Sequence, residues 1–398
     1  MDGDFPHGST ARRLGHGVYR DMPTTIFEKM SARARETGAI NLGQGFPDAQ
    51  GPEDILRAAA DALLTRSNQY PPSGGLPELR AAVAAHYALH QGLDLTAGEV
   101  IVTSGATEAI TASLLALVQP GDEVILLAPL YDAYLPLVER AGGVARVVRL
   151  TPPEWRITRE ALEAAASDRT RFLLVNNPVN PSGTVIPEGD LALLAEFCVA
   201  RDLIAICDEV WEHLVYDGAR HRPLIGFPGM RERTVKIGSA GKIFSLTGWK
   251  VGWMCAAPPI ATLLGRAHQF LTFSTPPNLQ WAVAQGLAKP ESWFADMRAD
   301  YQASRDRLVR GLRAAGFVVN VSEGTWFVTI DLPASGIVLD DVSFCERIID
   351  EAGVAAIPIS AFYPEEPVTH LARLCFSKAD AVIDAAVERL AGFRASLG

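Results

Sequence analysis

Short apolar runs bounded by turn residues recur between residues 99 and 257. Several are apolar at consecutive positions, which is typical of strands buried on both faces of a sheet. Segments with helical periodicity, such as TEAITASLLALVQ and DLALLAEFCVARD, separate many of them. This alternation predicts an α/β fold with a mostly parallel, seven-stranded sheet and crossover helices. The expected strands are EVIVTSG (99–105), DEVILLAP (122–129), ARVVRL (145–150), TRFLLVNNP (170–178), LIAICDEV (203–210), RTVKIGSA (233–240) and VGWMCAA (251–257).

The chain changes character after residue 290. A long amphipathic stretch covers 291–315, and a shorter mixed region with expected strands near FVTIDL and LARLCF follows it. We interpret this region as a second, smaller α/β domain hinged to the first. The opening residues are too few for a domain of their own. We therefore expect a large domain of residues 46–289 and a small domain made of residues 1–45 and 290–398.

The composition indicates a globular protein that acts on small molecules. Of its 398 residues, 48% are hydrophobic and 21% are charged, which is enough for one large core or two moderate ones. The net charge of −10 and the lack of a Lys/Arg block oppose a nucleic-acid partner. Five widely spaced cysteines without a CxxC pair indicate reduced thiols. With no apolar signal region and no run near the roughly 20 residues of a membrane span, we expect a cytoplasmic protein with no membrane partner.

Polar groups follow the expected strands, and ligands of open α/β sheets bind at the carboxyl ends of the strands. Asp208 ends the apolar run LIAICD, where an unpaired carboxylate would be costly, so it needs a cationic partner. In IVTSGATEAI the chain passes through Gly105 into a helix, which directs the amides of Ala106 and Thr107 toward an anion. The turn NNPVNPSG presents Asn180. These residues predict a ligand site at this edge of the sheet.

Lys242 lies in an unusual segment, KIGSAGKIFSLTGWKVGW (236–253), which is rich in small and apolar residues. Removing water from an ammonium group is costly, and a dehydrated lysine responds by losing its proton. A deprotonated lysine is a nucleophile. Ser239 and Lys250 flank it and add a hydroxyl group and a cation. Together the strand ends offer an anion site, a carboxylate that needs a protonated nitrogen, an amide and a lysine that can be neutral.

Pyridoxal phosphate requires all of these groups, because it has a phosphate, a protonated ring nitrogen, a phenolic oxygen and an aldehyde that condenses with lysine. The sequence resembles the class I/II aminotransferases of the fold-type I pyridoxal phosphate enzymes, most closely the kynurenine and methionine aminotransferase branch. The motifs that carry this resemblance are NLGQGFPD (41–48), NQY (68–70), NNPVNPSG (176–183), CDEVWEHLVYDG (207–218), GSAGKIFSLTGWKVGW (238–253) and RLCFSK (373–378). They follow the family's order along the chain.

The resemblance implies a role for each matched residue. Lys242 would bind the cofactor as an imine and carry the catalytic proton, and Asp208 would pair with the ring nitrogen. The other implied cofactor contacts are Gly105, Ala106, Thr107, Ser239 and Lys250 at the phosphate, Tyr131 on the ring, Asn180 and Trp211 at the phenolic oxygen, and Tyr70 from a second subunit. The implied substrate contacts are Arg373, which would clamp the α-carboxylate, the backbone of Gly45, and Asn180. No metal is expected.

Two positions depart from the family pattern. The residue after DEV is usually a tyrosine whose hydroxyl reaches the phenolic oxygen, and here it is Trp211. An indole N–H can donate one hydrogen bond but cannot accept one. It either donates to the phenolic oxygen or turns away as a packing residue. Lys250 stands where many relatives have arginine, although this branch commonly has lysine.

Competing interpretations exist for several motifs. Four site residues also have ordinary structural interpretations. Lys242 could be a surface lysine and Asp208 a helix cap or part of a structural ion pair. Asn180 could be a turn residue and Arg373 part of a structural salt bridge. His86 and His90 have the i,i+4 spacing of a metal site, but HYALH lacks the glutamate of HExxH, so we expect a solvated helix face. LGQGFPDA has no third glycine, which weakens a dinucleotide-binding reading.

The sequence predicts a homodimeric aminotransferase with composite active sites that moves the amino group of a neutral or aromatic L-amino acid to a 2-oxo acid by a ping-pong mechanism. Ile26, Phe46, Phe362 and Tyr363 are expected to face the substrate side chain. A C–S β-lyase on the same fold is one alternative, because the same chemistry expels a β-leaving group. A non-catalytic regulator is another, but such regulators carry an N-terminal DNA-binding domain, for which we expect no room before the matched region.

Overall fold

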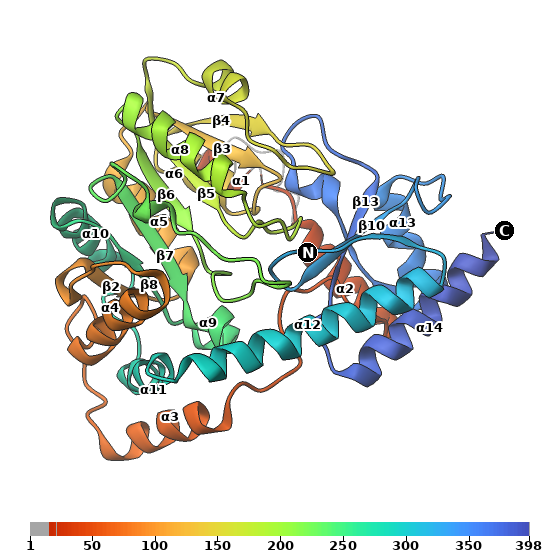
Figure 1. Ribbon diagram of the computed structural model, residues 1–398, viewed down its shortest axis with the longest axis horizontal. Coiled ribbons are helices and arrows are strands. Elements are labelled where there is room, and N and C mark those ends of the chain that lie inside the picture. Colours follow the sequence, from red (N-terminus) through yellow and green to blue (C-terminus); the bar gives the residue numbers. More distant parts are fainter. Residues whose placement is uncertain (1–15, 21, 398) are drawn as a thin grey trace, which may run out of the picture.

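The computed structural model describes residues 16–20 and 22–397. A large sheet of seven strands forms its larger part, and Figure 1 shows how the helices surround it. All seven expected strands pair in this sheet, in the order β2-β8-β7-β6-β5-β3-β4. The strands are β2 (Val100–Thr103), β3 (Glu123–Ala128), β4 (Val144–Arg149), β5 (Thr170–Asn176), β6 (Ile204–Asp208), β7 (Thr234–Ser239) and β8 (Gly252–Cys255). The predicted α/β fold with a seven-stranded sheet is confirmed.

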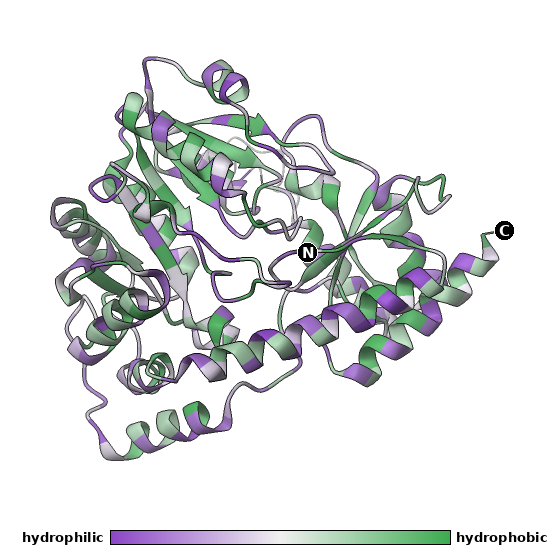
Figure 2. Ribbon diagram, in the orientation of Figure 1, coloured by the Kyte–Doolittle hydropathy of each residue, from purple (hydrophilic) through white to green (hydrophobic). Residues whose placement is uncertain are grey.

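The sheet is parallel except at β8, which runs antiparallel to both of its neighbours. Every residue of β2, β3, β7 and β8 is buried, because helices cover both faces. A strand buried on both sides has no solvent face to keep polar. This is why the sequence shows continuous apolar runs here, which appear as green strands in Figure 2.

Two hydrophobic cores flank the large sheet. The first contains side chains of α5 (Ala106–Leu117), α6 (Tyr134–Arg140), α7 (Arg159–Ala165), α8 (Glu188–Ala200) and α10 (Pro258–Leu271). The second contains side chains of α3 (Glu53–Thr65), α4 (Pro77–Gln91) and α11 (Pro277–Leu287). The first core also continues into the smaller part of the chain, with buried side chains such as Leu308, Phe327 and Leu390.

A smaller α/β part is reached along α12 (Glu291–Ala314), which runs from α11 to a four-stranded antiparallel sheet of order β12-β13-β10-β9 (Figure 1). The strands expected near FVTIDL and LARLCF are β10 and β13 of this sheet. Parallel pairing of β1 with β11 brings the early residues 40–41 here as well. The elements are α2 (Ile26–Thr37), β1 (Ile40–Asn41), β9 (Val318–Asn320), β10 (Phe327–Asp331), α13 (Asp341–Arg347), η5 (Ile348–Ala352), β11 (Val354–Ala355), β12 (Ile357–Pro358), η6 (Ile359–Phe362), β13 (Leu371–Cys375) and α14 (Asp380–Ser396).

Short helical elements complete the described chain. They are α1 (Gly17–Arg20), η2 (Ala97–Glu99), η3 (Leu224–Gly226), α9 (Ala240–Ile243) and η4 (Thr247–Trp249). The last two follow β7 directly and place Lys242 at the carboxyl end of the large sheet. None of the helices in the described ranges has the length and apolar character needed to cross a bilayer.

Candidate active site

A cavity of about 260 Å³ lies at the carboxyl ends of the parallel strands. It collects side chains and backbone from segments far apart in the sequence. Of the predicted site residues, those that line it are Gly105, Ala106, Thr107, Tyr131, Asn180, Asp208, Trp211, Ser239, Lys242 and Lys250. The three predicted residues outside this lining are Tyr70, Gly45 and Arg373.

One end of the cavity is a cradle for an anion. Gly105 precedes α5 with φ +79°, a conformation that glycine adopts readily, so the chain turns sharply from β2 into the helix. Gly252 of β8 packs directly on this turn, since a Cβ there would lie 2.8 Å from the carbonyl carbon of Gly105. Lys250 Nζ is 3.2 Å from where a Cβ of Gly105 would stand, and Ser239 lines the same cavity. The helix N-terminus, the ammonium and the hydroxyl together suit a phosphate group.

Asp208 is the last residue of β6 and is only 6% exposed. The hydroxyl of Tyr134 donates to its Oδ2 at 2.6 Å, and the amide of Val210 approaches Oδ1 at 3.4 Å. Burial raises the pKa of Asp208 above its ordinary value, although the hydrogen bond from Tyr134 acts in the opposite direction. A cation beside this carboxylate would therefore be strongly favoured. Sequence analysis missed Tyr134; the only signal for it is the repeated tyrosine in LYDAY.

Lys242 lies in α9, and its amine lies beside two indole rings that pack edge-on against each other with 5.0 Å between their centroids. Its Nζ is 4.7 Å from the ring centroid of Trp211 and 5.2 Å from that of Trp326. Burial lowers the pKa of Lys242 to about 8, although the charge of Asp208 opposes this shift. The neutral amine is thus far more populated near pH 7 than in an ordinary lysine. Trp326 directly precedes β10 and was not predicted, because nothing in its local sequence links it to Lys242.

Arg373 lies beside the cavity, in β13, and is 1% exposed. Its guanidinium donates to Asn180 Oδ1 and to the carbonyl oxygen of Gly43, both at 2.7 Å. It also stacks on the ring of Phe327 at 3.9 Å. Its Nε is buried without a hydrogen-bond partner, and burial lowers the pKa of Arg373 to about 10. The site therefore holds a cation whose hydrogen-bonding capacity is not used up.

Gly45 and Tyr70, which do not line the cavity, contact aromatic rings instead. A Cβ at Gly45 would lie 2.6 Å from Cζ of Phe327, so glycine lets the backbone pass over the ring that supports Arg373. Tyr70 is 83% exposed and packs edge-on against Phe273, with 5.3 Å between ring centroids. The contacts expected of Gly45 with a substrate and of Tyr70 with a second subunit's cofactor stay predictions.

The expectation that His86 and His90 lie on a solvated helix face is wrong. His86 is 2% exposed, and its Nε2 is 2.7 Å from Nε2 of His213. His90 Nδ1 lies 2.7 Å from a carboxylate oxygen of Glu291. The start of α12 covers this part of α4, and Phe294 packs against all three imidazole rings. Burial lowers the pKa of His86 to about 4 and that of His213 well below its ordinary value, so these two imidazoles stay neutral at pH 7.

The four residues expected around a substrate side chain divide into two pairs. Phe362 and Tyr363 are only 1% and 7% exposed. Phe362 packs edge-on against Phe27 at 5.3 Å, and the hydroxyl of Tyr363 donates to a backbone carbonyl group at 2.8 Å. Both side chains are therefore packed against protein groups, and the ring centroid of Phe362 lies 5.2 Å from the guanidinium of Arg373. Their contact with a substrate side chain stays a prediction. Ile26 is half-buried and Phe46 is 47% exposed, so both stay accessible to a ligand.

The donor set of the cavity matches pyridoxal phosphate group by group. The cradle at α5 and Lys250 would take the phosphate, and Asp208 would take the protonated ring nitrogen. Lys242, with its lowered pKa, would take the aldehyde carbon. A Cβ at Gly252 would lie 3.0 Å from the amide nitrogen of Ala106. Because Gly252 has none, this first amide of α5 stays open to an anion. The residues present therefore fit this cofactor.

Comparison with known proteins identifies the family. The family of class I and II aminotransferases matches residues 37–390. Methionine aminotransferase of Escherichia coli (strain K12) is 40% identical over 369 residues, covering 92% of this chain and 95% of the relative. Kynurenine–oxoglutarate transaminase 3 of Mus musculus is 34% identical over 402 residues, covering 92% and 87%. The structure of N-succinyldiaminopimelate aminotransferase from Mycobacterium tuberculosis superposes with a TM-score of 0.92 at 45% identity, over 95% of this chain and all of that one. This chain therefore belongs to the class I and II aminotransferases, enzymes of fold-type I that use pyridoxal phosphate.

Proposed function

We propose that this aminotransferase takes the amino group from a neutral, apolar or aromatic L-amino acid and passes it to a 2-oxo acid by a ping-pong mechanism. The observation that carries this proposal is Arg373, a buried guanidinium beside the cavity with an unpartnered Nε. A guanidinium binds a carboxylate bidentately, so it would orient the α-carboxylate of the donor next to Lys242. Aromatic rings surround it, which disfavours a charged side chain.

Each group that lines the cavity would have its own role in the reaction. The bound cofactor supplies an aldehyde that takes up the amino group and a ring that withdraws electrons from the substrate's Cα. Asp208 would keep the ring nitrogen protonated, and Asn180 and Trp211 would bind the phenolic oxygen. Lys242 would hold the cofactor between turnovers, and its neutral amine would then accept the Cα proton. Its pKa of about 8 suits this general-base role near neutral pH. Tyr131 would stack on the ring, and the cradle at α5 would anchor the phosphate.

Donor screening tests the substrate class. Methionine, phenylalanine, kynurenine, aspartate and N-succinyldiaminopimelate should each be assayed with several 2-oxo acids. The last compound is the substrate named for the Mycobacterium tuberculosis relative, and its side chain carries two further carboxylates. We expect methionine or an aromatic donor to give the highest kcat/KM, because no second cation would be needed. A higher kcat/KM for aspartate or for N-succinyldiaminopimelate would contradict this substrate class.

A C–S β-lyase is the alternative activity on the same site. Cysteine conjugates distinguish the two reactions by their products. Elimination yields pyruvate and ammonia, whereas transfer yields the oxo acid of the conjugate and a new amino acid. We expect transfer products to predominate when a 2-oxo acid is present.

We also propose a homodimer with composite active sites. Large apolar side chains are exposed near the C-terminal ends of α3 and α10, including Leu64 at 83% and Phe270 at 85%. Tyr70 is 83% exposed, and its ring packs against that of Phe273, three residues after Phe270. Exposed large apolar groups that lie close together are typical of an interface. Mixing inactive Tyr70→Ala and Lys242→Ala proteins should restore part of the activity through hybrid dimers, and a monomer at working concentration would contradict the proposal.

Two further assignments complete the proposal. We place the domain boundary so that residues 46–289 form the large domain and residues 1–45 and 290–398 the small one. Limited proteolysis near residue 290 tests this division. We propose a cytoplasmic location in keeping with the reduced cysteines, which cell fractionation tests.

A further inference from the structure

The turn after β6, with the sequence DEVWE (208–212), directs its side chains to two sides. Asp208 and Trp211 line the cavity. Glu209 and Glu212 are 2% and 4% exposed and bind instead to Lys236 of β7. The carboxylate proposed to meet the cofactor ring and two buried glutamates therefore share one short turn.

Lys236 connects the two glutamates. Its ammonium donates to Glu209 and, at 2.7 Å, to Glu212 Oε2. The side chain is 0% exposed, and Nζ lies 4.5 Å from the ring centroid of Tyr87. Burial alone would lower the pKa of Lys236, but the charges of Glu209 and Glu212 outweigh it and raise the pKa above its ordinary value. Lys236 is thus a charged group held inside the protein by these two carboxylates.

Other elements hold the same glutamates. Glu209 accepts the amide of Leu224 at 3.0 Å. Glu212 accepts the hydroxyl of Tyr87 at 2.9 Å and the side-chain amide of Gln91 at 2.6 Å, both from α4. The turn is therefore tied to β7, α4 and η3 through residues that do not line the cavity.

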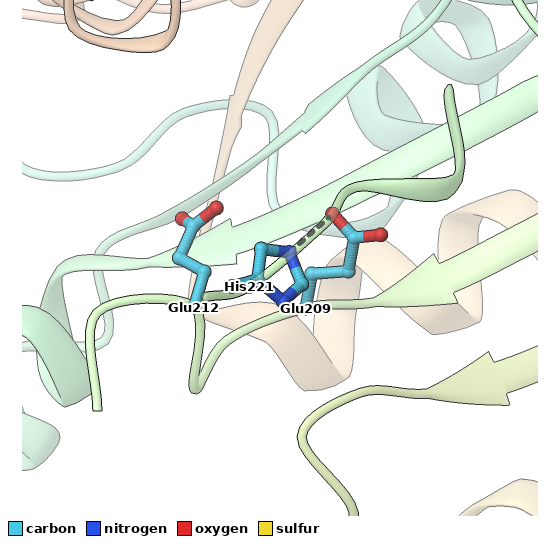
Figure 3. A group of neighbouring side chains, drawn as sticks. All are labelled: Glu209, Glu212 and His221. Carbon is cyan, nitrogen blue, oxygen red and sulfur yellow. Dashed lines mark ion pairs between the residues drawn. The ribbon is translucent and has the colours of Figure 1, made fainter. Parts of the chain in front are cut away.

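Glu209 and Glu212 form, with His221, a group whose ligand atoms all lie within 4.8 Å of one another, a spacing that would suit a metal ion. Figure 3 shows the imidazole of His221 between the two glutamates, with its Nε2 3.3 Å from Glu209 Oε2. The ammonium of Lys236 already bonds to both carboxylates. The cation of this cluster is therefore a lysine of the chain itself.

We propose that Lys236 is a positioning residue that acts through Glu209 and Glu212 to hold Asp208 in place for the cofactor's ring nitrogen. The inference rests on the role proposed for Asp208. Removing one member of a buried ionic cluster leaves an uncompensated charge, and the turn can relieve it only by moving or by taking up protons. Asp208 precedes Glu209 in the chain, so movement of the turn would displace the Asp208 carboxylate from the ring nitrogen. The phosphate cradle at α5 would stay intact.

Binding of two ligands to the apo-protein separates this role from simple stabilisation. The ligands are pyridoxal phosphate and its 1-deaza analogue, in which carbon replaces the ring nitrogen. Wild type should prefer pyridoxal phosphate by about tenfold or more, because only it can pair with Asp208. Lys236→Met should reduce this preference by about fivefold or more, whereas its affinity for inorganic phosphate should stay within about twofold of wild type. In the holoenzyme, kcat should fall with little change in the KM of the amino donor.

Matched variants complete the test. Glu123→Gln removes another fully buried carboxylate, bound by Arg146 and Arg169 at the start of β3, away from the cavity. It should lower stability without changing the preference between the two ligands. Glu212→Gln keeps Lys236 paired with Glu209, so it serves if Lys236→Met fails to fold. It removes the carboxylate that accepts from Lys236, Tyr87 and Gln91, so the end of the turn is held less firmly and the preference should fall in the same direction. An unchanged preference in Lys236→Met, or in Glu212→Gln where that variant replaces it, would overturn the inference. No preference in wild type would refute the role of Asp208 itself and the inference with it.

Discussion

Removing the hydroxyl of Tyr134 tests the ionisation of Asp208 in the folded protein. Tyr134→Phe deletes the hydrogen bond of 2.6 Å to Asp208 Oδ2 and keeps the ring that packs beside Tyr131. A hydrogen bond to a charged group contributes about 1.5–3 kcal/mol, which corresponds to roughly one to two pKa units. Because this bond favours the ionised carboxylate, its loss should raise the pKa of Asp208 still further above its ordinary value.

The effect on stability should depend on pH. A carboxyl group with a raised folded-state pKa favours folding while it is protonated, and this contribution is lost as the pH rises through the folded-state pKa. Above that pKa, the free energy of unfolding of Tyr134→Phe apo-protein should be lower than that of wild type by about 1.5–3 kcal/mol. Below the pKa of an unfolded aspartate, about 3.9, the raised pKa of Asp208 favours its protonated form in the folded state. The difference should there shrink to that of a neutral hydrogen bond, about 0.5–1.5 kcal/mol.

Urea unfolding of apo-protein across this pH range measures the difference. Tyr216→Phe is the matched control, because its buried hydroxyl donates at the same distance of 2.6 Å to a neutral acceptor, the carbonyl oxygen of Thr325. Its loss should cost about 0.5–1.5 kcal/mol at every pH. A pH-independent difference for Tyr134→Phe would refute the reasoning, because it would mean that Asp208 does not ionise in the apo-protein.

Substitutions at three further positions test the remaining roles. Lys242→Ala should abolish turnover while the cradle still binds the cofactor, and borohydride reduction with peptide mapping should label Lys242 in wild type; label on another lysine would contradict its assignment. Arg373→Gln should raise the KM of the amino donor by about 10- to 100-fold, from the loss of charge-assisted hydrogen bonds, and an unchanged KM would place the substrate carboxylate elsewhere. In a pH titration followed by the absorbance of the holoenzyme, Trp211→Phe should move the midpoint upward by about one to two pH units. Trp211→Tyr should leave the midpoint largely unchanged. An unchanged value for Trp211→Phe would leave Trp211 as a packing residue.

The large sheet could be predicted strand by strand because most of its strands are buried on both faces; the edge strand β4, which is largely exposed, is the exception. Strands buried on both faces appear as uninterrupted apolar runs, and β3 is buried at all six positions. The cavity residues could be predicted for a related reason, since they immediately follow these runs or belong to motifs such as DEVW. Residues that join the site through tertiary packing left no such signal. Trp326 contacts Lys242 from the loop before β10 of the smaller sheet. Lys236 is one of three lysines in the segment 236–253, and the sequence does not show that it alone pairs with two buried glutamates.

The error at His86 and His90 has a physical cause as well. Their spacing shows only that they share a face of α4, and polar residues on one face are usually solvated. Here the first turns of α12, about 200 residues later in the chain, cover that face with Phe294. When a helix packs against other elements on more than one side, the spacing of its polar residues does not show which side faces solvent.

The length of α12 has a mechanical consequence for catalysis. The helix has 24 residues, so it is about 36 Å long at 1.5 Å per residue. A tilt of about 5° around its first turn would carry its far end through roughly 3 Å, but a point less than halfway along would move by only roughly 1 Å. Tyr301 lies at such a point and packs against Trp326, whose ring stands beside Lys242. Such a lever would swing the outer elements of the smaller part through a large arc. Trp326, its neighbour Phe327 and Arg373, which stacks on Phe327, would move far less and so keep the substrate-binding cation beside Lys242.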